Sequence, residues 1–182
     1  MKKKKKPINP ATSKFTVLRQ VCNLIPAHLV PKIAREHDSE IHARTFSHWS
    51  HVVSLLHAQL SHSLGLNDVC DALQLHSGPL SAIRGATPPS RNGLSHANKT
   101  RPAEMAESLF WEVMKHLGTI APQFIKGKSA RRLHRFNCAI HAMDSTTIEL
   151  VANCMDWAQH RRRKAAAKCH LRLNLQSLLP QC

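Results

Sequence analysis

Apolar residues recur at helical spacing through the first third of the chain, and this spacing predicts short amphipathic helices. The first lies within 14–29, where Pro26 interrupts the pattern because proline lacks a backbone N–H. Residues 31–44 carry mixed charge. We expect Thr45 to cap a second helix that runs to about Ser61. The apolar stripe along this helix consists of Trp49, Val52, Val53, Leu56 and Leu60.

Two shorter helices are predicted next. One starts at Asn67, and Gly78 with Pro79 breaks it. A small polar helix over 91–99 follows two prolines and a serine. Short helices joined by tight turns, the last one polar, suggest a helix-turn-helix-like arrangement, although an ordinary solvent-facing helix is the alternative interpretation. The polar side chains that suit phosphates and base edges are Asn92, Ser95, His96, Asn98 and Arg101.

A long helix is expected to close this region. Pro102 opens it, because proline is favoured in the first turn of a helix, and the helix should reach about Leu117. Gly118 and Pro122 are expected to end it. Its buried side is predicted to consist of Met105, Leu109, Val113 and Met114.

After Lys126 the pattern becomes strand-like. Threonine and isoleucine in 137–150 favour a first strand, and strict alternation over 169–176 predicts a second, half-buried one. Two strands are not stable alone, so we expect a second domain to begin near residue 130 and to be unfinished. The predicted fold class is α+β, an all-helical domain followed by an incomplete α/β domain. The expected divisions are a disordered basic arm over 1–13, a helical domain over 14–125 and the second domain over 130–182.

Basic residues dominate the charge, with 26 Lys and Arg against 11 Asp and Glu and a net charge of +15. Five of them form the lysine run at 2–6, for which a solvated tail is the simplest interpretation. Another eleven lie between Lys126 and Arg172, among apolar residues that should fold. This distribution attracts a polyanion through counterion release, so the expected partner is double-stranded DNA. Single-stranded nucleic acid or RNA is less favoured, because the chain has no Tyr and its Phe and Trp are scattered.

Other classes of protein are disfavoured. No apolar run approaches the roughly 18 residues of a membrane-spanning helix, and none follows the lysines as a secretory signal requires. Six irregularly spaced cysteines without a Cys-x-x-Cys pair argue against a zinc ribbon or a disulfide framework and fit a reducing cytoplasm. His48 with His51, and Cys138 with His141, have ligand-like spacing, but surface or core residues are the default interpretation.

Asp144 is the carboxylate that the pattern singles out. It follows an apolar strand segment and precedes three hydroxyl residues, with an arginine cluster farther on. Enzymes of phosphoryl transfer use carboxylate oxygens to hold Mg²⁺ and nearby cations to hold the DNA backbone. One carboxylate is not enough for this chemistry, and a turn or cap is the alternative role for the segment.

The segment 142–150, Ala-Met-Asp-Ser-Thr-Thr-Ile-Glu-Leu, resembles the first catalytic strand of DDE transposases of the insertion-sequence-4 type. Residues 156–158 and 164–171 are similar to that family's second strand and its approach. Upstream, 46–49 and 90–98 are similar to its N-terminal helical domain. The resemblance covers most of the chain, and the order and spacing of its parts agree throughout.

The resemblance implies a ribonuclease-H-like catalytic domain, here with its first two strands only. Asp144 would be the first Mg²⁺ ligand of the Asp-Asp-Glu triad, acting at the terminal inverted repeats of a transposon, and the family analogy implies a homodimer. Glu149 and Asp156 follow Asp144 too closely to be the later pair. We therefore expect a truncated transposase that performs no strand transfer by itself.

An alternative function is a non-enzymatic DNA-binding protein that occupies transposon ends and represses transposition. Both functions need residues that contact DNA. We predict these to be Arg91, Asn92, His96, Asn98, Lys99, Arg101, Arg161, Arg162, Arg163, Lys164 and Lys168.

Overall fold

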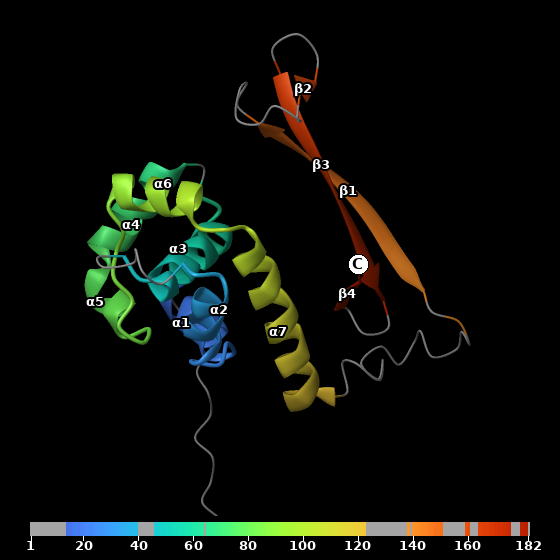
Figure 1. Cartoon of the computed structure of the whole chain (residues 1–182), viewed down its shortest axis with the longest axis horizontal. Helices are drawn as coiled ribbons and strands as arrows, with labels where there is room; N and C mark the ends of the chain where they lie inside the picture. Colours follow the sequence, from blue (N-terminus) through green and yellow to red (C-terminus); the bar gives the residue numbers. More distant parts are fainter. Residues whose placement is uncertain are drawn as a thin grey trace, which may run out of the picture. The chain divides into compact units, whose positions relative to one another are not determined.

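Helices come first in the chain and strands follow, as the computed structural model shows (Figure 1). The chain divides into two compact units, Met1–Lys115 and His116–Cys182, and each is described here by itself. The fold class is therefore α+β, as predicted. The residues that the structure describes are 14–39, 46–63, 65–122, 138, 140–150, 159–160, 164–175 and 179–181.

Helices α1 (Lys14–Asn23) and α2 (Leu29–Glu36) begin the first unit, and both pack against α3. The break between them surrounds Pro26, as the pattern predicts. Helix α2 lies partly in the segment where the sequence shows only mixed charge. It accommodates Pro31 in its first turn, where a missing N–H leaves no helical hydrogen bond unmade. Its buried side consists of Leu29, Val30, Ile33 and Ala34.

Helix α3 (His48–Ser61) is capped by Ser47, whose hydroxyl oxygen accepts a hydrogen bond from the backbone N–H of Ser50 at 3.0 Å. The expected cap, Thr45, lies outside the described residues, and the helix begins three residues after it. Helix α3 ends with His62 in the left-handed conformation, φ 53°.

The buried side of α3 differs from the predicted stripe. Leu60 is 38% exposed, which contradicts the prediction, whereas two serines and two histidines are buried with Val53. The serines fit because their hydroxyls have partners. The Oγ atom of Ser50 accepts a hydrogen bond from the backbone N–H of Thr87, and Ser54 donates to the carbonyl of Ser50 at 2.7 Å. The small side chain of Ser50 lets the segment at Thr87 approach α3 closely. Apolar character alone therefore does not identify the buried side of this helix.

Helices α4 (Leu66–Leu75), α5 (Ser77–Ser81) and α6 (Arg91–Thr100) follow. The backbone N–H of Gly65 donates to the Asp68 carboxylate at 3.1 Å, which fixes the start of α4. Helices α4 and α6 pack against each other. One hydrophobic core joins α1, α3, α4, α5 and α6, and its members include Leu18, Cys22, Val53, Leu73, Leu80, Ile83 and Leu94.

Helix α7 (Glu104–Ile120) is the longest of the described helices. It continues through Gly118, which we expected to end it. None of its residues is buried, although a buried side was predicted. The four apolar residues of that prediction are partly exposed, and Phe110 is 40% exposed. None of the described helices, α7 included, is long and apolar enough to cross a membrane.

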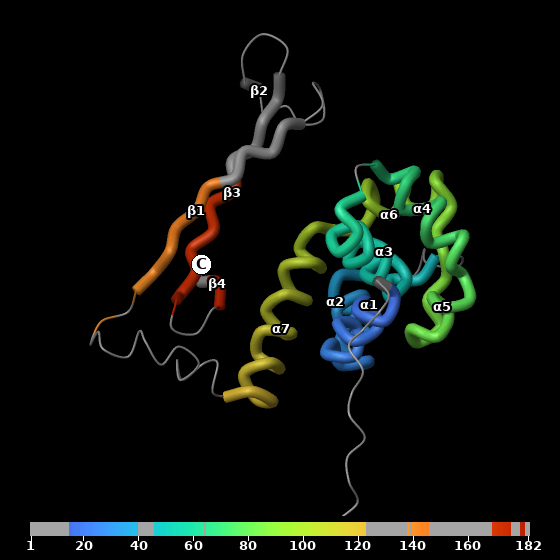
Figure 2. The backbone as a smooth tube through the Cα atoms, turned by 180° about the vertical axis from the view of Figure 1, so that it is seen from behind, coloured from blue at the N-terminus to red at the C-terminus, as the bar shows by residue number. Residues whose placement is uncertain are grey.

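The strands described in the second unit form an antiparallel sheet around β3 (Lys164–Asn174). Strands β1 (His141–Leu150) and β3 lie side by side (Figure 2). Strand β1 pairs with β3 along its whole length, and the register places Asp144 opposite Leu171. The short strands β2 (Gln159–His160) and β4 (Leu179–Gln181) pair with opposite ends of β3.

Both predicted strands are present, although their bounds differ. The first begins four residues later than expected and the second begins five residues earlier. The second strand is not half-buried along its length, because Leu171 is 50% exposed and Cys169 is also exposed. The sheet agrees with the α+β prediction, and the ribonuclease-H-like fold implied by the resemblance stays a prediction.

Candidate nucleic-acid interface

Helix α6 presents a polar face because its apolar residues are used inward. Leu94 and Ala97 are buried in the core. The hydroxyl of Ser90 caps the helix by accepting a hydrogen bond from the N–H of Gly93 at 3.0 Å. A Cβ at Gly93 would lie 2.9 Å from that hydroxyl oxygen, so glycine leaves room for the cap. The exposed residues opposite the core, here called the α6 polar face, are Arg91, Asn92, Ser95, His96 and Lys99.

The α6 polar face is continuous along the helix. Side chains four positions apart lie one above the other, so Arg91, Ser95 and Lys99 form one row and Asn92 with His96 forms the next. Helix α6 contains no acidic residue. The face therefore offers two cations, an amide, a hydroxyl and an imidazole to a single ligand surface.

Arg91 is held by an ion pair with Asp71 of α4. The guanidinium donates to both carboxylate oxygens, at 2.9 and 3.2 Å. Both side chains are more than half exposed, so the pair contributes little to folding. The pair orients Arg91 at the start of α6. Another anion can replace the Asp71 carboxylate as the partner of Arg91 with little change in free energy.

Asn98 lies beside the polar face but is engaged within the unit. Its side-chain oxygen lies 2.7 Å from Nε2 of His51 on α3. Burial lowers the pKa of His51, the hydrogen bond to Asn98 opposes this effect, and the charge of Arg101 adds to the lowering. At neutral pH the imidazole is therefore uncharged and donates to Asn98.

Arg101 is also used inside the unit. Its guanidinium donates to the carbonyl oxygens of Phe46 and Ser47, and its carbon lies 5.4 Å from the centre of the Phe46 ring. Burial lowers the pKa of Arg101, but a guanidinium stays charged at neutral pH. Arg101 thus fastens the segment before α3 to the end of α6.

Of the predicted DNA contacts, Arg91, Asn92, His96 and Lys99 lie together on the exposed side of α6. Sequence reasoning missed that the side chains of Asn98, which is exposed, and Arg101, which is half-buried, are bonded to other parts of the helical unit. The helical spacing contained a usable signal for Asn98, because position 98 lies between the buried Leu94 and the exposed Arg91 on the helical wheel. The remaining predicted contacts, Arg161, Arg162 and Arg163, lie outside the described residues, and only the backbone of Lys164 and Lys168 is described.

Asp144 lies in β1 with its carboxylate exposed, and one of its oxygens accepts a hydrogen bond from the N–H of Ser145 at 2.8 Å. It is the one carboxylate among the described side chains of the second unit. Across the described residues, no group of three His, Cys, Asp or Glu could hold a metal ion. The described residues therefore do not fit a Mg²⁺ site on their own, because a single carboxylate supplies too few of the ligands that Mg²⁺ needs.

The fold and the α6 polar face define an α+β protein with an exposed basic and polar helix on its helical unit. Residues 13–83 match a family model described as a domain of unknown function, DUF4372. This domain is found in transposase-associated proteins. The match covers the helices from α1 to α5 and ends before α6. No curated protein and no solved structure matches the chain.

Proposed function

We propose that the helical unit binds double-stranded DNA through the α6 polar face, as part of a DDE transposase of the insertion-sequence-4 type. The observation that carries the proposal is the single exposed face that joins Arg91, Asn92, Ser95, His96 and Lys99. The net charge of +15 and the transposase-associated domain over 13–83 support it.

The side chains of this face suit the major groove. Asn92 can pair with an adenine edge through two hydrogen bonds, and Arg91 or Lys99 can donate to guanine or to phosphates. Arg91 reaches either target by exchanging its exposed carboxylate partner, Asp71, for the DNA. The ligand we propose for this face is the terminal inverted repeat of a transposon, with two copies of the chain bringing two ends together.

A second candidate function is occupancy of transposon ends without chemistry. It is favoured by the sequence after Asp144, where Glu149 and Asp156 follow too closely to be the later pair of an Asp-Asp-Glu triad. Asp144 as the first Mg²⁺ ligand belongs to the first proposal alone. Neither proposal predicts strand cleavage by this chain alone, because one carboxylate supplies too few ligands for Mg²⁺. Addition of the purified chain to a transposition reaction of an active transposase that uses the bound sequence tests the second function, which predicts that occupancy of the ends inhibits transposition.

The experiment that tests DNA binding compares two matched triple variants. The test variant carries Asn92→Ala, His96→Ala and Lys99→Ala. The control carries Asn23→Ala, His28→Ala and Lys32→Ala, three residues of the same types that are exposed on or beside α1 and α2. Both variants lose the same side-chain chemistry and the same charge.

Fluorescence anisotropy with labelled duplexes, selected from a random library by the unaltered chain, gives the dissociation constants. We expect the test variant to lose at least about tenfold in affinity, since good base contacts are each worth about 1–3 kcal/mol. The control should bind within about twofold of the unaltered chain, because it keeps the face. Equal losses in both variants would overturn the assignment of the interface to α6.

Salt dependence provides a second readout. Each phosphate contact adds about 0.9 to the slope of log affinity against log salt. If Lys99 contacts a phosphate, Lys99→Ala reduces the slope by about one such unit, whereas Lys32→Ala leaves it unchanged.

A further inference from the structure

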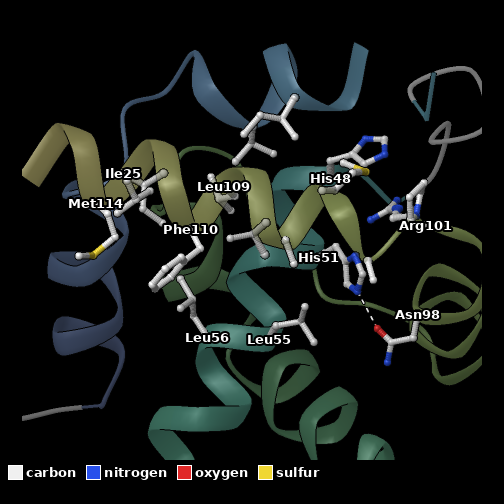
Figure 3. A pocket seen from close by; sticks show the side chains of 18 residues that line it. Ile25, His48, His51, Leu55, Leu56, Asn98, Arg101, Leu109, Phe110 and Met114 are labelled. Carbon is white, nitrogen blue, oxygen red and sulfur yellow. Dashed lines mark hydrogen bonds between the residues drawn. The ribbon is translucent and has the colours of Figure 1, made fainter. Parts of the chain in front are cut away.

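The helical unit contains a cavity of about 580 Å³ between α7 and the helices α2 and α3 (Figure 3). Its walls are apolar, and they include Ile33, Leu55, Leu56, Leu109 and Phe110. In Figure 3, His48, His51, Asn98 and Arg101 lie toward one end, and Ile25, Phe110 and Met114 lie toward the other. The cavity therefore has an apolar body and a polar end.

The size of the cavity is that of a ligand site. A volume of about 580 Å³ falls within the range of about 300–1,000 Å³ found for small-molecule sites, whose walls are mostly apolar with a few polar groups. The apolar residues of α7 that line it are only partly buried, so they have surface left for a ligand to cover.

The polar end is cationic. Arg101 donates to two backbone carbonyl oxygens, which uses part of the five N–H groups of its guanidinium. No carboxylate lines the cavity. The ion pairs found among the described residues are Lys32 with Glu36 and Arg91 with Asp71, so neither neutralises Arg101.

We propose that this cavity binds a small amphipathic anion, an aliphatic carboxylate whose chain covers the apolar walls and whose head group pairs with Arg101. The charge of Arg101 selects an anionic head over a neutral one, and the Asn98 amide supplies a further donor. This site is separate from the α6 polar face, and its occupancy does not depend on whether the chain binds DNA.

Isothermal titration calorimetry of the full chain with three probes below their micelle concentrations tests the head group. The probes are dodecanoate, dodecanol and dodecyltrimethylammonium. We expect dodecanoate to bind at one molecule per chain and at least about tenfold more tightly than dodecanol, with no binding of the cation. Equal affinity for the acid and the alcohol, or no binding of either, would overturn the proposal.

A cavity-filling variant tests the place. Ala106 of α7 lines the cavity, so Ala106→Phe should abolish dodecanoate binding while the thermal unfolding midpoint is maintained or raised. The matched control is Ala82→Phe, at an exposed alanine outside the cavity, which should bind as the unaltered chain does. Unchanged binding in Ala106→Phe refutes the location. Self-association that Ala106→Phe removes, without binding of any probe, would assign the cavity to a second copy of the chain instead.

Discussion

The side chain of Leu94 anchors helix α6 in the hydrophobic core, and its truncation should strongly lower the free energy of unfolding of the helical unit. The side chain is 1% exposed and belongs to the core cluster that also contains Leu73 and Leu80. Leu94→Ala removes buried methyl groups and leaves a cavity, for which the usual cost is about 2–5 kcal/mol. A domain of this size has a total stability of about 5–15 kcal/mol, so the loss is a large fraction of it.

The measurement is thermal unfolding followed by circular dichroism at 222 nm, where the helical unit dominates the signal. A loss of about 1 kcal/mol lowers the midpoint of a domain of this size by about 4–8 °C, so Leu94→Ala, with a cost of at least about 2 kcal/mol, should lower it by at least about 8 °C. The control is Leu75→Ala on α4, which removes the same atoms from a side chain that is 80% exposed, and it should change stability by less than about 0.5 kcal/mol. Equal midpoints for the two variants would refute the assignment of Leu94 to the core.

Three further predictions concern groups inside the helical unit. Burial holds the pKa of His51 in the folded state below its unfolded value of 6.5. The buried neutral ring is therefore compatible with the fold above pH 6.5, and the folded state loses stability as the pH falls from there through the lower folded pKa. Urea denaturation at several pH values should therefore show less acid destabilisation in His51→Gln than in the unaltered chain. Burial raises the pKa of Cys22 to about 11, so mass spectrometry after brief alkylation of the native chain should find Cys138 modified and Cys22 intact. The Arg84 guanidinium lies 3.7 Å from the Trp49 ring centre and donates a hydrogen bond to the carbonyl oxygen of Cys22. Arg84→Ala should therefore cost about 1–2 kcal/mol in the same denaturation assay, and an unchanged stability would contradict a stabilising role for both contacts.

The helices with strong local signals were predictable. Helix α6 begins and ends within one residue of its expected bounds, because Ser90 is a good cap and the apolar spacing is short and clear. Helix α3 was found from its periodicity, but its buried side was not. Hydrogen bonds of Ser50 to a distant loop make a serine a core residue, and no local pattern encodes such a partner.

The candidate site was predictable in part for the same reason. Arg91, Asn92, His96 and Lys99 lie on the exposed side of a correctly predicted helix. The roles of other side chains depend on contacts between residues about 50 positions apart, such as Arg101 with the carbonyl of Phe46. The sequence gives the charge of such a residue, but its contacts in the folded chain determine whether the charged group bonds within the protein or is free to bind a ligand.

If the α6 polar face binds DNA as proposed, its length limits how many base pairs it can contact. At 1.5 Å per residue, the distance along the helix from Arg91 to Lys99 is about 12 Å. Base pairs are spaced about 3.4 Å apart, so the face covers about four of them. A four-base-pair word recurs every few hundred base pairs, roughly, whereas a genome offers about a million or more competing sites. One such helix can recognise a short sequence but cannot by itself select a single site in a genome. Recognition of a unique transposon end would therefore require several such short sequences to be bound together.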